Sequence, residues 1–268
     1  MGTGKLVRLN RLFAHPSRDF LGVAVDHFIN YRVGGMEPAI RRMGKTLPEI
    51  VKGRPDAITM HRGVADTFWK KHAGSVPMIL QCAIIRPDDS CREYIADPED
   101  AVRLGADAFA ISAFTRGDSE AMYLRRIVEA VKAAERFEMP VITHIYPRRF
   151  ENGGVEISFE PEDVAWAVHC AMECGVDIVK APYCNDVKAF AEIVADCPVP
   201  LVAAGGPKCE TLRDSLDMQG DVMKTGARGA TVGRNIWGFP NIVGAVKAFK
   251  AVIHDGATAA DAMASAGL

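Results

Sequence analysis

The 268-residue sequence lacks a long apolar segment, since no stretch approaches the roughly 20 apolar residues that a membrane helix needs. Its N-terminus, Met1-Gly2-Thr3-Gly4-Lys5, lacks the apolar core of a secretory signal. Positive charge is not in excess, because 32 Lys and Arg face 34 Asp and Glu, for a net charge of -2. We therefore expect a soluble, cytoplasmic protein with neither a membrane nor a nucleic acid as partner.

The seven cysteines include no Cys-x-x-Cys pair, and no histidine cluster has metal-ligand spacing. We expect reduced, mostly buried thiols and no metal site. Hydrophobic residues make up 49% and charged residues 25% of the chain, so a sizeable core is available and extensive disorder is excluded.

Eight short apolar runs, each of strand length and bounded by turn residues, recur along the chain. They are Leu21–Asp26, Ala57–His61, Met78–Ala83, Ala108–Phe114, Val141–Tyr146, Asp177–Lys180, Leu201–Ala204 and Gly229–Gly233.

The segments between these runs show helical spacing. One helix is expected to begin at Glu160-Pro161, to bury Val164, Val168 and Met172, and to end at Gly175. Others are expected to begin at Asp97-Pro98, at Asp118 or Ser119, and at Asn185.

Eight alternating strand and helix units predict a parallel (β/α)8 TIM barrel, formed by residues 1–268 as a single domain. The alternative is a doubly wound open sheet. A dinucleotide-binding version of that fold needs a Gly-x-Gly-x-x-Gly after the first strand, and the sequence has none there.

Active sites of such barrels lie at the carboxyl ends of the strands, and here these ends are unusually polar. They read Asp26-His27, His61-Arg62, Gln81, Ser112, Tyr146-Pro147-Arg148, Lys180, Gly205-Gly206 and Gly233-Arg234. Because side chains alternate across a strand, Lys180 shares a face with Ile178, Tyr146 with His144, and Asp26 with Ala24. If these faces point inward, an amine, a phenol and a carboxylate converge.

Lys180 ends an otherwise apolar run, where a charged amine is costly to bury. Burial lowers a lysine pKa and yields the neutral amine that attacks a carbonyl to form a Schiff base. The structural alternative is a lysine that extends into solvent.

Tyr146 is a candidate proton donor and acceptor, and Asp26 a candidate partner of a substrate hydroxyl or of its proton. The alternatives are a barrel-lining tyrosine, and an aspartate that caps a helix or pairs with Arg62 or Arg148. His27, His61 and His144 are weaker candidates, because histidines at strand ends are often structural.

Two glycine turns, Gly205-Gly206 and Gly233-Arg234, follow the last two strands, where many barrels bind phosphate through backbone N–H groups and an arginine. Two ordinary tight turns are the alternative. The predicted substrate- and phosphate-binding residues are His27, His144, Arg148, Gly205, Gly206, Gly233 and Arg234.

Together these segments resemble the class I aldolase family of the archaeal-type fructose-1,6-bisphosphate aldolases. That family also contains aminodideoxyheptulosonate synthases and the thiolase that processes phosphorylated autoinducer-2, within the wider DeoC/LacD-like group. The resemblance rests on the segments Arg8–Phe13, Val25–His27, Tyr146–Arg148, Asp177–Lys180, Gly205–Lys208, Gly226–Gly229 and Gly233–Trp237.

The resemblance implies that Lys180 forms the Schiff base, Tyr146 transfers protons, Asp26 contacts a substrate hydroxyl or relays a proton, and the two glycine turns with Arg234 bind phosphate. It implies that no metal or other cofactor is needed, because the lysine iminium withdraws the electrons. The implied substrate is a phosphorylated sugar. The implied assembly is a homo-oligomer, often of ten subunits in this family.

Three positions depart from the family pattern: Phe28 and Arg149 replace glycines, and His144 replaces a tryptophan common in the fructose-bisphosphate members. All three are expected near the pocket mouth, which puts fructose 1,6-bisphosphate itself in doubt as the substrate.

The expected activity is reversible cleavage of a phosphorylated ketose such as fructose 1,6-bisphosphate. The nearest alternative is a transaldol-type synthase or a thiolase that uses the same lysine. Two further alternatives are a non-catalytic phosphosugar-binding barrel and an isomerase that forms no covalent intermediate.

Overall fold

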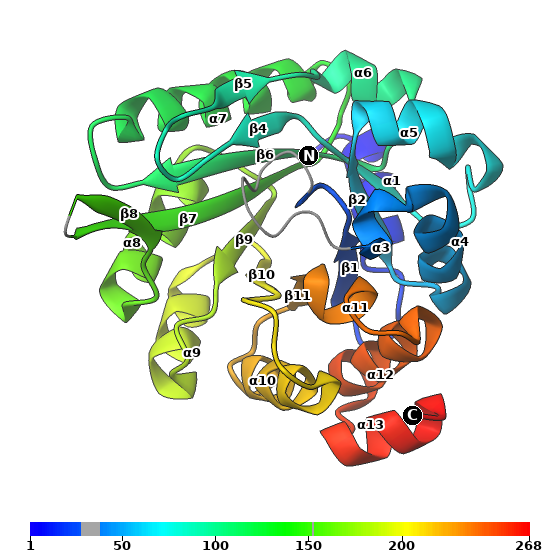
Figure 1. The fold of residues 1–268 in the computed structure, drawn as a ribbon. Helices are drawn as coiled ribbons and strands as arrows, with labels where there is room; N and C mark the ends of the chain where they lie inside the picture. Colours follow the sequence, from blue (N-terminus) through cyan, green and yellow to red (C-terminus); the bar gives the residue numbers. More distant parts are fainter. Residues whose placement is uncertain (28–37, 152) are drawn as a thin grey trace.

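The computed structural model describes residues 1–27, 38–151 and 153–268. Eight parallel strands form a closed barrel, in which β6 pairs with β7 to complete the circle β6-β3-β2-β1-β11-β10-β9-β7 (Figure 1). The strands are β1 (Phe20–Ala24), β2 (Ala57–His61), β3 (Met78–Gln81), β6 (Ala108–Thr115), β7 (Val141–Glu151), β9 (Ile178–Pro182), β10 (Leu201–Ala204) and β11 (Gly229–Val232). The predicted TIM barrel is confirmed, and the open doubly wound sheet is excluded.

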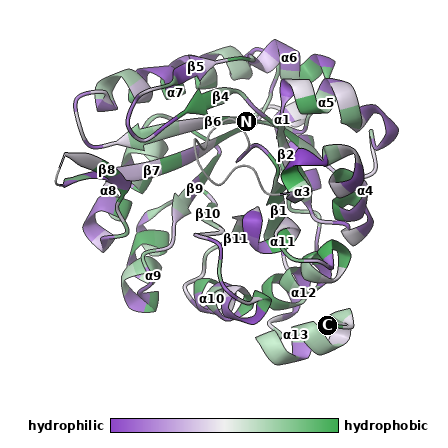
Figure 2. Cartoon of the chain, viewed as in Figure 1, coloured by the Kyte–Doolittle hydropathy of each residue, from purple (hydrophilic) through white to green (hydrophobic). Residues whose placement is uncertain are grey.

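Helices surround the barrel (Figure 1). They are α1 (Thr3–Leu12), α3 (Pro38–Arg41), α4 (Met43–Gly53), α5 (Arg62–Phe68), the 3-10 helix η1 (Trp69–Lys71), α6 (Pro98–Arg103), α7 (Glu120–Glu135), α8 (Pro161–Glu173), α9 (Val187–Asp196), α10 (Leu212–Lys224), α11 (Arg234–Trp237), α12 (Ile242–Asp255) and α13 (Ala259–Ala266). Hydrophilic and hydrophobic stretches alternate along them (Figure 2), as expected of helices that cover a barrel and face water.

Two antiparallel additions extend from the carboxyl ends of the strands. β4 (Ala83–Ile85) pairs with β5 (Arg92–Tyr94), and the end of β7 pairs with β8 (Gly154–Ile157). Ile85 and Ile157 from these additions reach the pocket described below.

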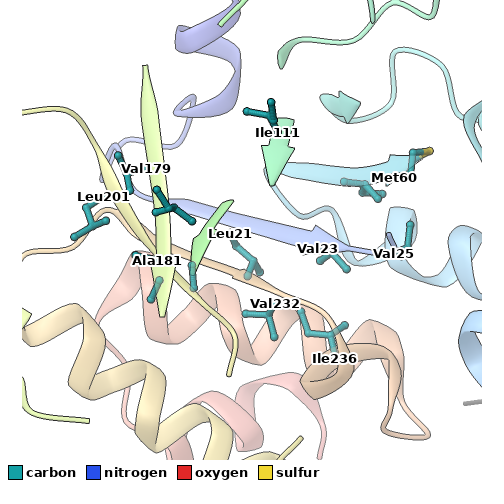
Figure 3. Packing of buried hydrophobic residues seen from close by; sticks show 14 of the residues in the cluster. Leu21, Val23, Val25, Met60, Ile111, Val179, Ala181, Leu201, Val232 and Ile236 are labelled. Carbon is teal, nitrogen blue, oxygen red and sulfur yellow. The ribbon is translucent and has the colours of Figure 1, made fainter. Parts of the chain in front are cut away.

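Side-chain alternation along the strands separates two apolar layers. Outward-facing residues such as Val179 and Leu201 pack under the helices in the larger core cluster (Figure 3). Inward-facing residues at the amino-terminal end of the barrel form a second cluster together with Leu12 and Phe13, at the end of α1. This second cluster includes Phe20, Ala57, Ile79, Ala108, Ala110, Ile142, Ile178 and Val202.

Most predicted helix starts are confirmed. Asp97 forms a capping box with Asp100, and α7 and α8 begin after Ser119 and Glu160. The start of α9 was misplaced by one residue: Asp186 caps the helix, while Asn185 adopts a left-handed turn with φ 59°. Met172 was wrongly predicted to be buried, because it lies on the open side of α8 against a surface groove shared with α9.

All seven cysteines are free thiols, which agrees with the expectation of reduced residues. Only Cys82 and Cys184 are buried, and the other five are partly exposed, so the expectation that most are buried was wrong. Among the described residues, no helix combines the length and the apolar character needed to cross a membrane.

Candidate active site

Lys180 lies on β9 at the centre of the carboxyl-terminal end of the barrel. It is 5% exposed and stands opposite His144 in the register between β7 and β9. Together with His27, Tyr146 and Ile157, it lines both an inner and an outer pocket. The lysine therefore points inward, as the alternation of side chains predicted, and does not extend into bulk solvent.

Asp26 and His27 follow β1 and reach the same centre. Asp26 Oδ1 lies 3.5 Å from His27 Nδ1. Burial opposes ionisation of Asp26, but the nearby His27 and Lys180 outweigh this effect and lower its pKa to about 2. Burial, reinforced by Lys180, lowers the pKa of His27 to about 4 despite Asp26. At neutral pH the site therefore holds an aspartate anion beside a neutral imidazole.

Neither arginine named as an alternative partner of Asp26 pairs with it in the described residues. Arg62 pairs with Asp66 and Asp100 on the outside of the barrel, and Arg148 pairs with Asp89. Asp26 Oδ2 instead accepts a hydrogen bond of 3.3 Å from Gln81 inside the barrel.

Tyr146 is two residues beyond His144 on the inward face of β7 and lines both pockets. Burial and the negative charge of Asp26 raise the pKa of its phenol well above the ordinary value. The phenol is therefore neutral and carries a proton that it can donate.

Gln81 forms the hydrogen-bonding centre of the site, a role the sequence pattern did not assign to it. It is fully buried at the end of β3, and its side-chain nitrogen lies 3.0 Å from Ser112 Oγ and 3.1 Å from His144 Nδ1. With its bond to Asp26, it connects strands that are far apart in sequence. The only signal in the sequence was a glutamine that ends a buried strand.

The inner pocket is small, about 90 Å³, and has both polar and apolar lining residues. The polar ones include Asp26, Ser112, His144 and Lys180. The apolar ones are Ile85, Pro87, Phe114 and Ile157. This arrangement suits a short polar group held next to the lysine amine.

The outer pocket contains both predicted glycine turns together with Arg234. A Cβ at Gly205 would lie 2.8 Å from the Val232 backbone, and Gly206 has φ 67°, so the chain runs close to its neighbour there. Asn235 Nδ2 holds this turn through the carbonyl oxygens of Gly205 and Pro207 at 2.9 and 2.8 Å. Exposed backbone and a guanidinium thus border one cavity.

Arg148 was predicted to bind substrate, and its observed contacts are with protein groups around the pocket. It lines neither pocket, and its guanidinium donates to the Pro87 and Arg116 carbonyls, to Ser119 and to Asp89. The residue is 2% exposed. Strand alternation places Arg148 on the same face as Tyr146, but Arg148 follows the last residue of β7 that pairs with β6. There its guanidinium stacks on Phe114 and holds the loop that carries Pro87.

The three positions that depart from the family pattern do not all lie at the pocket. His144 lies in the inner pocket, whereas Arg149 is exposed on the β7–β8 hairpin and pairs with Glu151 and Glu156. Glu156 lines the outer pocket, so Arg149 borders the mouth only through it. Phe28 lies outside the described residues.

His61 has a structural role. Its Nε2 lies 3.2 Å from the Ala83 carbonyl oxygen, and the residue is not among those that line either pocket. Within the described ranges, no group of three His, Cys, Asp or Glu side chains is arranged to hold a metal ion.

Comparison with known proteins places this site in a family. The profile of the DeoC/LacD family aldolases matches residues 20–238. The 2-amino-4,5-dihydroxy-6-oxo-7-(phosphonooxy)heptanoate synthase of Streptomyces griseus is 29% identical, over 97% of this chain and 94% of that protein. The class 1 fructose-bisphosphate aldolase of Thermoproteus tenax is 32% identical, over 68% of each chain.

Solved structures agree with the sequence relatives. An archaeal fructose 1,6-bisphosphate aldolase superposes with a TM-score of 0.83 at 27% identity, covering 94% of this chain and all of that one. A further structure of an archaeal fructose-1,6-bisphosphate aldolase, 26% identical with a TM-score of 0.83, is matched over 93% of this chain and 99% of that one. In it the catalytic lysine is covalently bound to the carbinolamine intermediate of the substrate. The chain therefore belongs to the DeoC/LacD family of Schiff-base aldolases.

Proposed function

We propose that this protein catalyses reversible aldol cleavage of a phosphorylated ketose through a Schiff base on Lys180. The observation that carries the proposal is the position of Lys180, which is buried and shared by the inner and outer pockets. A ketose that lies across both pockets has its carbonyl at the amine, its phosphate toward Arg234 and the rest of its chain toward His144.

The reaction begins when Lys180, in its unprotonated form, attacks the C2 carbonyl and forms a carbinolamine. Loss of water gives the iminium, with protons moving through Tyr146 and Asp26. The C3–C4 electron pair then passes to the iminium, which leaves an enamine and releases an aldehyde. Tyr146, a neutral phenol, protonates the enamine carbon, and hydrolysis of the imine returns the lysine.

The outer pocket supplies binding energy at the phosphate end of the substrate. Backbone N–H groups exposed at a glycine turn and an arginine are typical phosphate ligands in barrels of this type. A phosphate bound by Gly205, Gly206, Gly233 and Arg234 would fix the distance from the ketose carbonyl to Lys180, because the pocket also includes that lysine.

Incubation with a panel of phosphorylated ketoses, followed by borohydride reduction, tests this proposal. We expect a ligand-sized mass increase that peptide mapping assigns to Lys180. Turnover of a ketose without any adduct would contradict the covalent mechanism and would favour an isomerase or another non-covalent route. An adduct on a different lysine would contradict the assignment of Lys180.

A synthase that transfers the enamine to another aldehyde is the second candidate. It is favoured by near full-length similarity to a heptanoate synthase and to the 2-amino-3,7-dideoxy-D-threo-hept-6-ulosonate synthase of Halobacterium salinarum, the latter 28% identical over 99% of this chain and 97% of that protein. Product analysis with and without added acceptor aldehydes separates the two activities. The same assay with coenzyme A tests for a thiolase.

A further inference from the structure

His144 presents two distinct ring nitrogens at the inner pocket. The residue is 3% exposed, lies opposite Lys180 in the strand register, and is one of the polar residues that line the inner pocket. Nδ1 lies 3.1 Å from Gln81 Nε2. For Nε2 there is no hydrogen-bond partner in the described part of the chain, so this nitrogen is left for a group that enters the pocket.

The orientation of the Gln81 amide is fixed by the backbone. The Ala83 N–H donates to Gln81 Oε1 at 2.9 Å, which only an oxygen can accept. His61 holds the carbonyl of the same Ala83 from the other side. The Gln81 NH₂ group is therefore the part that faces Ser112, Asp26 and His144.

This orientation determines where His144 carries its proton. An NH₂ group can only donate, so a proton on Nδ1 would place two donors against each other. Nδ1 therefore accepts, and the proton is on Nε2. The ring is neutral, because burial and the neighbouring Lys180 lower the pKa of His144 well below its ordinary value.

We propose that Gln81 is a positioning residue that fixes this tautomer, and that His144 Nε2–H donates a hydrogen bond to the aldehyde oxygen of the reaction. The second part rests on the proposed aldolase function. Phosphate ligands border the outer pocket, so the group that enters the inner pocket beside His144 is the other half of the ketose. We therefore expect the enzyme to prefer aldehydes that are small and polar next to the carbonyl group.

The chemistry balances without proton transfer by the imidazole. In cleavage, the C4 hydroxyl proton passes to the Asp26 carboxylate while the C3–C4 electron pair moves to the iminium. In the reverse direction the enamine carbon attacks the aldehyde, and negative charge develops on its oxygen before the proton returns. A neutral N–H that is already aimed at this oxygen stabilises that charge at no reorganisation cost.

The tautomer is measurable without any substrate. In protein carrying ¹⁵N-labelled histidine, we expect the His144 signals to show a protonated Nε2 and an unprotonated Nδ1 between pH 5 and 8. His144→Gln identifies these signals by their loss. A protonated Nδ1, or a cationic ring at pH 7, would overturn the proposal.

Variants of Gln81 then test whether this residue sets the tautomer. In Gln81→Glu, a carboxylate replaces the donor and draws the proton onto Nδ1, so Nε2 loses its hydrogen. We expect the ¹⁵N pattern to reverse and kcat to fall about 10- to 100-fold, while borohydride still traps the Lys180 adduct. Gln81→Met, which adds no acceptor, should give a mixture of tautomers and a smaller loss.

Gln219→Met is the matched control, because Gln219 is equally buried but lies on α10 and its Nε2 has no hydrogen-bond partner in the described residues. It should keep the wild-type ¹⁵N pattern and kcat. An unchanged tautomer in both Gln81→Glu and Gln81→Met overturns the role of Gln81. A reversed tautomer with unchanged kcat overturns the role of His144. Failure of the wild type to form any adduct contradicts the aldolase function, while the ¹⁵N result still decides the tautomer.

Discussion

The two ends of the barrel interior are built from the same strands and have opposite chemistry. On β9, Ile178 packs in the apolar cluster at the amino-terminal end, and Lys180, two residues later on the same face, lies between the pockets. On β7, Ile142 and His144 repeat this contrast. One end of each strand thus stabilises the fold while the other positions reactive groups.

The difference shows what a polar interior requires. Residues of the apolar end need only shape and volume, since burial itself is favourable. At the polar end a buried group is costly unless it has a partner, and Gln81 contacts three side chains and one backbone N–H. Function here depends on hydrogen-bond geometry, and stability depends on packing.

Lys180→Met is the sharpest test of whether the polar end of the barrel serves activity and the apolar end serves stability. We expect turnover and borohydride trapping to be abolished, because the nucleophile is gone. The melting temperature should stay the same or rise, since an apolar chain of similar length replaces a buried amine. Activity assays, mass spectrometry and thermal unfolding measure these outcomes. Substantial residual turnover would contradict the mechanism.

Tyr146→Phe removes only the phenolic hydroxyl from the polar end. We expect kcat to fall about 10²- to 10⁴-fold, the range for loss of a general acid, with slow formation of the Lys180 adduct still detectable. Tyr183→Phe is the control, because Tyr183 is buried against Phe190 and is not among the residues lining either pocket. Equal effects in both variants would show that Tyr146 acts only through packing.

Ile178→Ala tests the apolar end of the same strand. Removing a fully buried isoleucine should lower the free energy of unfolding by about 2–5 kcal/mol, and Ile178→Val by about 0.5–1.5 kcal/mol. We expect kcat of the folded protein to be unchanged at 25 °C. Denaturant unfolding and steady-state kinetics give both values. A large loss of kcat without loss of stability would mean that the two ends are not independent.

The smallest expected effect concerns pH. The pKa of His27 falls from 6.5 to about 4 on folding, so its neutral form stabilises the protein fully above pH 6.5. As pH falls from 6.5 to 4, the His27 side chain binds a proton in the unfolded state but not in the folded state. The free energy of unfolding therefore falls by about 2–3 kcal/mol. Asp26 contributes little in this window, because its pKa drops from 3.8 to about 2 and most of its effect falls below pH 4.

Denaturant unfolding at pH 6.5, 5.5 and 4.5 measures this dependence. His27→Asn should flatten the curve, although His144, shifted in the same direction, retains part of the slope. An identical slope in the variant would contradict the assignment to His27.

Much of the fold followed from local signals. Alternation of β-branched and aliphatic runs with capped helices predicted eight strands, and the structure closes them into a barrel. The errors arose where two different structures fit the local sequence equally well. Asn185 and Asp186 are both good caps, and only the chain path chooses between them. Met172 fits the helical period, but its side chain lines a surface groove between α8 and α9.

The candidate site was predictable in part for the same reason. Period-two alternation places Lys180, Tyr146 and Asp26 on inward faces once the strands are known, and the structure brings them together. Arg148 shows the limit of alternation: it shares a strand face with Tyr146, but it lies where β7 stops pairing with β6 and begins to pair with β8. Its guanidinium there pairs with Asp89.

The sequence by itself determined the barrel, the inward lysine and the glycine turns, because each depends on local spacing and on backbone geometry. Only the tertiary structure decided the contacts of Gln81, the environment of His144 and the partners of Arg148. These depend on hydrogen bonds between residues far apart in sequence, such as those that join Gln81 to Ser112, 31 positions away, and to His144, 63 positions away. Such pairings arise when the barrel closes, since no local pattern encodes which donor will face which acceptor.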